Sequence, residues 1–441
     1  MRIGLEELIG AVGGRAPGSP AGLAFETFHT DSREVVRGGL FFALKGASSD
    51  GHGFVGDAAA RGAAGVVVDR PVEAGGAVAI LVEDTWEALY RAAGHVLGTV
   101  SPLVVGVTGS NGKTSTREMT AAALGATLRV RRTEGNLNTE TGVPLTILSL
   151  DRADQALVLE MGMQGPGEIA RLAALARPRV GVVTSVGTVH LEFFASREEL
   201  ARAKGELPAA LPAEGLAVLN AEDEYTPLLR SLTRARVVTF GLGAGDLKGD
   251  GYRPEGEGGT MRVRGVEVRV GLPGRHQARN ALAALAVAEF AGVPLPDAAA
   301  RLGAVKVPGR LSRVAGKGGV TLVDDAYNAS PESMLAAFET LAEWRGGGRL
   351  LGVLGEMREL GTHGETAHRK VGARAREVFD ELAVMGAGLG PVLAAAAGAE
   401  VVPDRAAAAA WVAEHARPGD TVLVKASHGL GLDELVRSLR A

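Results

Sequence analysis

The chain has 441 residues, 46% of them hydrophobic and 22% charged, which is typical of a folded protein with more than one domain. Its net charge of -4 gives no reason to expect binding to nucleic acid or to an anionic membrane. Because it contains no cysteine, disulfides and thiolate chemistry are excluded. The N-terminal residues lack a signal-peptide pattern, and Glu289 and Pro294 interrupt the most apolar helical run. We therefore expect a cytoplasmic protein without membrane insertion.

Short apolar runs alternate with longer helical stretches along the chain, a pattern typical of parallel α/β sheets. The strands predicted in this way span residues 103–107, 157–160, 180–186, 237–241, 321–324, 350–354 and 421–424. The helices predicted after several of them include 114–128, 331–344 and 366–382. Residues 261–270 alternate apolar and polar around Gly265, which predicts a β-hairpin at an edge, and the Gly-rich segment 241–260 is expected to form a surface loop.

Two breaks in this pattern predict three domains. The first follows residue 100, at Ser101-Pro102, and the second lies near Val307-Pro308-Gly309. We predict an N-terminal domain over residues 1–100 and a central P-loop ATPase domain with a parallel sheet over 101–308. A C-terminal Rossmann-like α/β domain is predicted over 309–441.

The most informative segment leads from an apolar strand through a glycine-rich turn into a helix. It consists of Thr108, Gly109, Ser110, Asn111, Gly112, Lys113 and Thr114. The two glycines let backbone N–H groups turn towards phosphate oxygens, and the helix N-terminus adds a partial positive charge. Lys113 would reach the β- and γ-phosphates of ATP, and the Thr114 hydroxyl would bind Mg²⁺. The spacing departs from the general P-loop pattern, because Val107 stands where its first glycine belongs. A helix-capping turn is therefore the alternative.

Three further residues are candidate partners for the metal and phosphates. Glu160 ends a strongly apolar strand, where a carboxylate needs either a metal or an ion-pair partner. His190 follows the strand predicted at 180–186, although a lone histidine is more often an ordinary surface or core residue. Lys204 lies in a helical stretch of a chain that mostly uses arginine, and its alternative is a solvated helix lysine.

Together these residues resemble the muramyl ligase family, which builds the peptide of bacterial cell-wall precursors. The motifs that carry the resemblance are Thr-Gly-Ser-Asn-Gly-Lys-Thr at 108–114, Glu-Met-Gly at 160–162, His190, and Ala-Lys-Gly-Glu at 203–206. The family's loop reads T-G-x-N-G-K-[ST], so the shifted glycine fits it. The resemblance implies an ATP- and Mg²⁺-dependent ligase that activates a carboxylate as an acyl phosphate and joins it to an amine.

The resemblance also implies roles for the candidate catalytic residues. Thr114 and Glu160 would hold one Mg²⁺ against the β- and γ-phosphates, and His190 would bind a second ion. Lys204 resembles the family lysine that CO₂ converts into a carbamate, and Lys113 would neutralise phosphate charge.

Later segments resemble the family's remaining nucleotide contacts. Asn280 matches the adenine-contacting segment at the start of an Ala-rich helix. Arg310 resembles an arginine that reaches phosphate, and Asp325 resembles an aspartate near the ribose.

Other motifs indicate which member of the family the chain resembles. Ser32 and Arg33, in Thr-Asp-Ser-Arg, look like part of the uridine-nucleotide-binding domain of the two late-acting members. Segments 136–144, 160–169 and 327–331 resemble the member that adds D-alanyl-D-alanine to UDP-N-acetylmuramoyl-tripeptide, although Ser330 stands where asparagine is more usual. We therefore expect small-molecule substrates and a monomer. His363, Lys425 and Ser427 are candidates for gripping the dipeptide.

Four alternatives stay open at this point. The first is the member that adds a diamino acid, and the absence of its Asp-Asn-Pro-Arg motif argues only against the diaminopimelate form. The second is a folylpolyglutamate synthase, which normally starts close to its phosphate loop, whereas about 100 residues precede the loop in this chain. The others are a P-loop kinase or switch, and a nucleotide-binding scaffold without catalysis.

Overall fold

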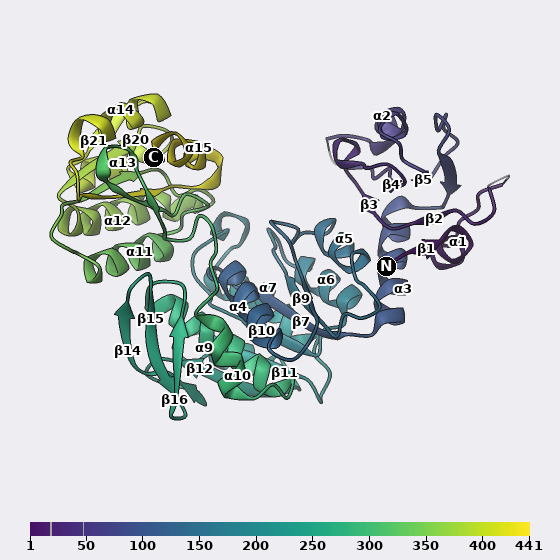
Figure 1. Ribbon diagram of the computed structural model, residues 1–441, viewed down its shortest axis with the longest axis horizontal. Coiled ribbons are helices and arrows are strands. Elements are labelled where there is room, and N and C mark those ends of the chain that lie inside the picture. The colour runs from purple at the N-terminus through teal and green to yellow at the C-terminus, as the bar shows by residue number, and fades with distance from the viewer. Residues whose placement is uncertain (18–19, 47) are drawn as a thin grey trace. The chain divides into compact units, whose positions relative to one another are not determined.

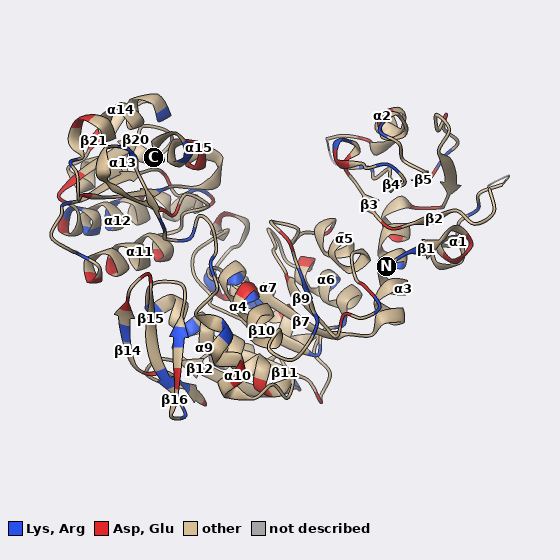
Figure 2. Ribbon diagram, in the orientation of Figure 1, with Lys and Arg blue, Asp and Glu red and all other residues tan. Residues whose placement is uncertain are grey.

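The computed structural model describes residues 1–17, 20–46 and 48–441. The chain forms two compact units. The first comprises Met1–Gly106, Leu128–Met163 and Gly167–Arg179, and the second comprises Val107–Thr127, Gln164–Pro166 and Val180–Ala441. Within the described ranges, no helix is long and apolar enough to cross a membrane. Lys and Arg residues are interspersed with Asp and Glu residues along both units (Figure 2).

The first unit begins with a small parallel sheet whose strand order is β3-β4-β5-β6. Its strands are β3 (Phe28–His29), β4 (Leu40–Phe42), β5 (Gly65–Val68) and β6 (Val78–Leu81). The accompanying elements are β1 (Ile3–Gly4), β2 (Ala24–Phe25), α1 (Leu5–Val12), α2 (Val55–Ala60), α3 (Thr85–Val100) and the 3₁₀ turns η1 (Ser32–Glu34) and η2 (Gly51–Phe54). Phe41, Val66 and Val68 of the sheet pack with Val55 and Ala58 of α2, which gives this region its own core.

The rest of the first unit is a second set of parallel strands and helices. It contains β8 (Val130–Arg132), α5 (Gly142–Leu148), β9 (Ala156–Glu160) and α6 (Glu168–Ala176). Strands β8 and β9 are parallel, and β9 is buried at every position. Strand β7 (Leu103–Thr108) begins in this unit and ends in the second.

The second unit opens with a parallel sheet whose strands follow the order β10-β11-β12-β13. These strands are β10 (Val180–Val183), β11 (Leu216–Asn220), β12 (Arg236–Gly241) and β13 (Leu247–Lys248). The helical elements are α4 (Lys113–Leu124), η3 (Leu191–Phe193), α7 (Arg197–Ala209), α8 (Thr226–Ser231), α9 (Arg275–Phe290) and α10 (Leu295–Leu302). The Thr184 amide donates to the Thr108 carbonyl at 3.0 Å, so the end of β7 lies beside the residues that follow β10.

A separate antiparallel sheet of three strands follows in the chain. Its strands are β14 (Asp250–Glu255), β15 (Gly258–Val263) and β16 (Val266–Val270). The hairpin predicted around Gly265 is confirmed, because β15 pairs with β16 across Arg264-Gly265. The expectation of a surface loop over 241–260 is wrong, since this segment contains β13, β14 and the start of β15. Most of β14 is exposed, so it lacks the apolar alternation by which a strand is recognised in sequence.

The last part of the second unit is a six-stranded sheet with the order β17-β18-β22-β19-β20-β21. The strands are β17 (Ser312–Ala315), β18 (Thr321–Asp324), β19 (Leu350–Leu354), β20 (Glu381–Met385), β21 (Glu400–Val402) and β22 (Thr421–Lys425). All neighbouring pairs are parallel except β17 with β18. The connecting elements are η4 (Lys317–Gly319), α11 (Pro331–Glu343), η5 (Gly361–His363), α12 (Gly364–Val378), α13 (Gly390–Ala397), α14 (Arg405–His415), η6 (His428–Leu430) and α15 (Leu432–Leu439).

Helices cover both faces of this sheet (Figure 1). Phe338 of α11, Val371 of α12 and Leu393 of α13 belong to one buried cluster. Trp411 of α14 and Leu435 of α15 belong to the cluster on the opposite face. This is the doubly wound, Rossmann-like arrangement that the sequence predicts. The predicted helix over 366–382 is too long, because α12 ends at Val378 and Leu382 lies in β20.

Candidate active site

The phosphate loop joins β7 to α4 and depends on two glycines. Gly109 has φ 141° and Gly112 has φ 84°, both in the region that favours glycine. A Cβ added at Gly109 would lie 1.9 Å from the Thr184 hydroxyl, and one at Gly112 would lie 2.8 Å from the Asn280 side chain. Helix α4 starts at Lys113, directly after this turn. The segment therefore has the strand, turn and helix that a P-loop requires.

Residues that follow β10 hold the loop in shape. The Thr184 hydroxyl donates to the carbonyls of Thr108 and Asn111, at 3.2 and 2.5 Å. The Ser110 amide donates to the Ser185 carbonyl at 2.8 Å, and the Ser110 hydroxyl accepts from the Gly187 amide at 2.8 Å. Thr184 and Gly187 were not identified from the sequence. The only local signal for Thr184 is a polar residue directly after a buried strand.

Three basic side chains, Lys113, His190 and Lys204, lie beside the loop, where the charge of one lowers the pKa of another. The Lys113 ammonium donates to the Gly109 carbonyl at 2.8 Å. Lys204, on α7, is only 1% exposed, and burial together with the Lys113 charge holds its pKa well below the usual lysine value. Burial, followed by the charges of Lys113 and Lys204, lowers the pKa of His190 to about 3. The Lys113 charge therefore disfavours protonation of both neighbours, and Lys113 is the cation of this group that suits an anionic ligand.

His190 has an unusual backbone conformation and a partner from the C-terminal sheet region. Its φ is 65°, a conformation that non-glycine residues rarely adopt, and it directly precedes η3. Its imidazole Nδ1 contacts the Glu359 carboxylate, and Glu359 also has a positive φ of 63°. Burial, and then the charge of Glu192, raise the pKa of Glu359. The sequence gives no signal for Glu359, which lies far from His190 along the chain.

A pocket of about 320 Å³ opens beside the loop. Its lining contains seven of the residues singled out from the sequence, namely Asn111, Gly112, Thr114, Asn280, Arg310, Asp325 and Lys425. The lining also includes His276, whose pKa is lowered to about 3 by burial and by the charges of Arg279, Lys425 and Arg310. Such a volume, bordered by a phosphate loop and several cationic groups, suits a nucleotide.

A buried ion pair lies at one wall of this pocket. The Lys425 ammonium is 2.7 Å from the Asp325 carboxylate, and their side chains are 1% and 7% exposed. Lys425 also donates to the Asn328 carbonyl at 2.9 Å, and the Leu311 amide donates to Asp325 at 3.2 Å. Burial is the largest influence on both groups: it raises the pKa of Asp325 and lowers that of Lys425. Asp325 and Lys425 therefore depend on each other for their charges.

The start of α11 contacts the phosphate loop and the segment before His190. The Ser330 hydroxyl donates to Asn111 Oδ1 at 2.9 Å, and it also caps α11 by accepting from the Ser333 amide. The Glu332 carboxylate accepts from both the amide and the hydroxyl of Thr188, each at 2.9 Å. Glu332 was not predicted as a site residue, because residues 144 positions apart give no local signal of contact.

The other predicted site residues belong to the first unit. Glu160 ends β9 and is 3% exposed, and its carboxylate accepts from Asn138 Nδ2 at 2.8 Å. Ser32 is buried at the start of η1. Arg33 has a side chain that is 82% exposed and lies 2.6 Å from Asp31. Because Glu160 is buried, water does not freely solvate its carboxylate at the end of β9. The carboxylate therefore interacts with specific partners.

The residues present partly suit Mg²⁺. Within the ranges that the structure describes, no three His, Asp or Glu side chains gather as a ready-made metal site. The Thr114 hydroxyl and the Glu160 carboxylate offer the oxygen ligands that Mg²⁺ prefers. Lys204 suits a cation only after conversion to a carbamate, for which a buried lysine with a lowered pKa supplies the neutral amine.

Comparisons with known proteins agree with this arrangement. The model of the Mur ligase middle domain matches residues 107–288, that of the Mur ligase glutamate ligase domain matches 309–428, and that of the Mur ligase family catalytic domain matches 26–95. The UDP-N-acetylmuramoyl-tripeptide–D-alanyl-D-alanine ligase of Bacillus subtilis is 37% identical over 93% of this chain and 92% of its own length.

Two solved structures extend the similarity to the fold. A structure of MurF from Acinetobacter baumannii has a TM-score of 0.90 at 28% identity, covering 100% of this chain and 99% of that one. The MurF ligase of Thermotoga maritima in complex with ADP has a TM-score of 0.81 at 32% identity, covering 93% of this chain and 96% of that one. With a phosphate loop, a cationic pocket and relatives that match nearly its whole length, this chain belongs to the Mur ligase family.

Proposed function

We propose that this protein joins D-alanyl-D-alanine to UDP-N-acetylmuramoyl-tripeptide in peptidoglycan precursor synthesis. The terminal carboxylate of the tripeptide attacks the γ-phosphorus of ATP, which gives an acyl phosphate and ADP. The amine of the dipeptide then attacks the acyl carbon, and phosphate leaves with one oxygen of the original carboxylate. The sequence relatives and the ADP complex of a structural relative support this reaction and the use of ATP.

The observation that carries the proposal is the group of Lys113, His190 and Lys204 beside the phosphate loop. A loop that binds phosphates through backbone amides and a lysine positions the γ-phosphate and stabilises its charge during transfer. Arg310 and the Asp325–Lys425 pair line the adjacent pocket, where we place the nucleotide. Asn280 lines this pocket close to Gly112 of the loop, and we assign it to the adenine. Mg²⁺, when bound by Thr114, Glu160, His190 and a carbamoylated Lys204, would neutralise charge on the phosphates.

Carbamoylation of Lys204 is directly testable. The neutral form of an amine attacks CO₂, so a buried lysine with a lowered pKa is suited to the reaction. We expect ¹³CO₂ to give one carbamate resonance in the ¹³C NMR spectrum of the wild type that is missing from Lys204→Met. Lys248, which is exposed on β13, supplies the matched control: Lys248→Met should keep the resonance. A spectrum without any carbamate signal would contradict this assignment.

Ser32 and Arg33 are our candidates for the uridine-nucleotide end of the substrate. A hydroxyl and a guanidinium are suited to diphosphate oxygens. Arg33 is exposed and held by Asp31, so its guanidinium is accessible. We also propose that the protein acts as a cytoplasmic monomer, and that its domains span residues 1–100, 101–308 and 309–441.

Phosphate release from ATP and Mg²⁺ tests the proposed function. With UDP-N-acetylmuramoyl-tripeptide and D-alanyl-D-alanine both present, release should be rapid and the pentapeptide product should appear by mass spectrometry. A P-loop kinase or switch would release ADP without requiring both a carboxylate and an amine. A family member of different specificity would respond to the dipeptide precursor with lysine or diaminopimelate instead. A non-catalytic scaffold would tolerate His190→Ala and Lys204→Met, whereas the ligase should lose most of its activity.

A further inference from the structure

A second pocket, of about 610 Å³, lies at the opposite end of the C-terminal sheet from the nucleotide pocket. Its lining includes Thr321 and Thr421, the first residues of the neighbouring parallel strands β18 and β22. At the far ends of the same strands, Asp325 directly follows β18 and Lys425 is the last residue of β22. Lys425 lies four positions beyond Thr421 along the extended strand, or about 13 Å at 3.3 Å per residue. A ligand in this pocket would therefore occupy a different place from ATP.

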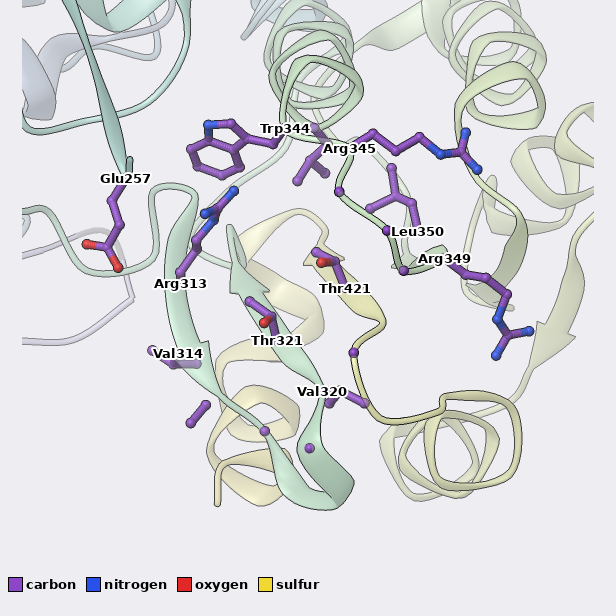
Figure 3. A pocket seen from close by; sticks show the side chains of 18 residues that line it. Glu257, Arg313, Val314, Val320, Thr321, Trp344, Arg345, Arg349, Leu350 and Thr421 are labelled. Carbon is purple, nitrogen blue, oxygen red and sulfur yellow. The ribbon is translucent and has the colours of Figure 1, made fainter. Parts of the chain in front are cut away.

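The cationic groups around this pocket are not equivalent. Arg345 lies 2.6 Å from Asp380, and Arg349 lies 2.8 Å from Asp420. Both side chains extend to the same side of the pocket, away from Arg313 (Figure 3). Carboxylates therefore already neutralise these two cations, which leaves Arg313 as the arginine to consider.

Arg313 is positioned but not neutralised by a direct ion pair in the described part of the chain. Its guanidinium stacks on the Trp344 ring, 3.7 Å from the ring centroid, as Figure 3 shows. Its Nε atom is buried, and among the described residues it has no hydrogen-bond partner. The pocket's carboxylate, Glu257, acts on the Arg313 guanidinium through its charge, but its direct ion pair is with Lys306 at 2.9 Å. Because the protein covers Nε, a ligand in the pocket would reach the terminal N–H groups of this half-buried side chain, which lines the pocket.

The rest of the lining leaves room for a ligand and gives it apolar walls. Gly346 and Gly347 line the pocket, and a Cβ at either would meet nothing within 4 Å. Position 348 requires glycine because the backbone of Gly419 lies close to it. A Cβ added at Gly348 would lie 2.1 Å from the Gly419 carbonyl oxygen. Val320 and Leu350 form apolar parts of the wall and are 7% and 3% exposed. The pocket thus combines an apolar wall with one arginine that has no direct carboxylate partner among the described residues, and small-molecule sites usually combine such features.

We propose that this pocket binds a small organic anion, whose carboxylate or phosphate group contacts Arg313 and whose compact apolar body packs on Val320 and Leu350. A guanidinium held flat against an aromatic ring presents its N–H groups in a fixed fork that matches either anionic group. The site is distinct from the nucleotide pocket and does not depend on the proposed function.

Isothermal titration calorimetry with phenyl phosphate and, separately, benzoate tests this proposal on the full-length protein. Saturating ADP is included so that the phosphate loop is filled. We expect saturable binding of at least one probe below about 10 mM, and weaker binding of inorganic phosphate, because it lacks an apolar body. Binding of phenyl phosphate alone would assign a phosphate group, and binding of benzoate alone a carboxylate.

Three variants locate the binding. Arg313→Gln should weaken binding by about tenfold or more, and Arg313→Lys by a smaller factor, because lysine keeps the charge but not the fork. Arg345→Gln is the matched control and should bind within about twofold of the wild type, since Asp380 already occupies that guanidinium. An unchanged ADP affinity would show that Arg313→Gln is folded. The absence of saturable binding to the wild type, or an affinity unchanged in Arg313→Gln, would overturn the proposal.

Discussion

The buried pair of Asp325 and Lys425 makes a prediction whose size follows from its surroundings. The two groups are 2.7 Å apart, and their side chains are 7% and 1% exposed. Removing one partner leaves the other as an unpaired buried charge, which typically costs 3–5 kcal/mol. The remaining group can avoid part of this cost by becoming neutral. The free energy of that neutralisation is therefore an upper limit on the loss of unfolding free energy.

That upper limit can be worked out from the ordinary pKa values of the two side chains. Protonating an aspartate of ordinary pKa 3.8 at pH 7 costs about 4 kcal/mol, at 1.36 kcal/mol per pH unit. Deprotonating a lysine of ordinary pKa 10.5 at pH 7 costs about 5 kcal/mol. We therefore expect Lys425→Met to lose up to about 4 kcal/mol and Asp325→Asn up to about 5 kcal/mol of unfolding free energy at pH 7.

The two variants should respond to pH in opposite directions. In Lys425→Met, the folded state holds a proton on Asp325 that the unfolded state has released, so the loss should shrink to about 2 kcal/mol at pH 5. In Asp325→Asn, the unfolded state holds the extra proton on Lys425, so the loss should shrink as the pH rises towards 9. The double variant should be less destabilised than the sum of the two single variants, because it leaves no unpaired charge.

Urea unfolding followed by tryptophan fluorescence measures these changes. The tryptophans are Trp86, Trp344 and Trp411, so a Trp86→Phe background restricts the signal to the region of the C-terminal sheet. This restriction matters because a chain with several domains need not unfold in one step. Losses below about 1 kcal/mol in both single variants, or the same pH trend in both, would refute the reasoning.

Three further changes have expected outcomes. Gly109→Ala should weaken ADP binding about tenfold or more in calorimetry, because its Cβ would lie 1.9 Å from the Thr184 hydroxyl and φ is 141°; an unchanged affinity would contradict the loop geometry. Ser330→Ala should lower the unfolding free energy by about 1 kcal/mol through loss of the α11 cap, while Ser330→Thr should keep most of it. His276 has an ordinary pKa of 6.5 and a folded value of about 3, so the unfolded state takes up a proton as the pH falls below 6.5 and the folded state loses stability. His276→Gln should reduce this loss by at most about 2 kcal/mol at pH 5, and identical stability–pH curves would contradict the shift.

The sequence predicts those strands and helices whose apolar residues coincide with the positions that are buried in the structure. The strands 321–324 and 350–354 have the predicted bounds, because short runs with a buried apolar centre in a doubly wound sheet are recognisable without their neighbours. The end of α12 is missed because Phe379 follows it without glycine or proline, and Glu381–Met385 suits a helix as well as a strand. Strand β14 is missed because most of its residues are exposed.

The candidate site likewise contains some residues that the local sequence identifies and others that only the folded structure identifies. The phosphate loop is recognisable because its glycines, lysine and threonine are contiguous and their backbone requirements are local. Thr184 contacts the start of the loop across 76 residues, and Glu332 contacts Thr188 across 144 residues, so only the folded chain identifies them. Asp325 was singled out from its motif, but its pairing with Lys425 depends on the parallel register of β18 and β22.

The central claim is that the substrate carboxylate is activated as an acyl phosphate, and transfer of an oxygen isotope tests it most directly. UDP-N-acetylmuramoyl-tripeptide labelled with ¹⁸O in its terminal carboxylate is incubated with the protein, ATP, Mg²⁺ and D-alanyl-D-alanine, and the released phosphate is analysed by mass spectrometry. The account predicts one ¹⁸O atom in each phosphate released from fully labelled substrate, because the carboxylate oxygen leaves with the phosphoryl group. Phosphate that carries oxygen only from ATP and water would contradict the account.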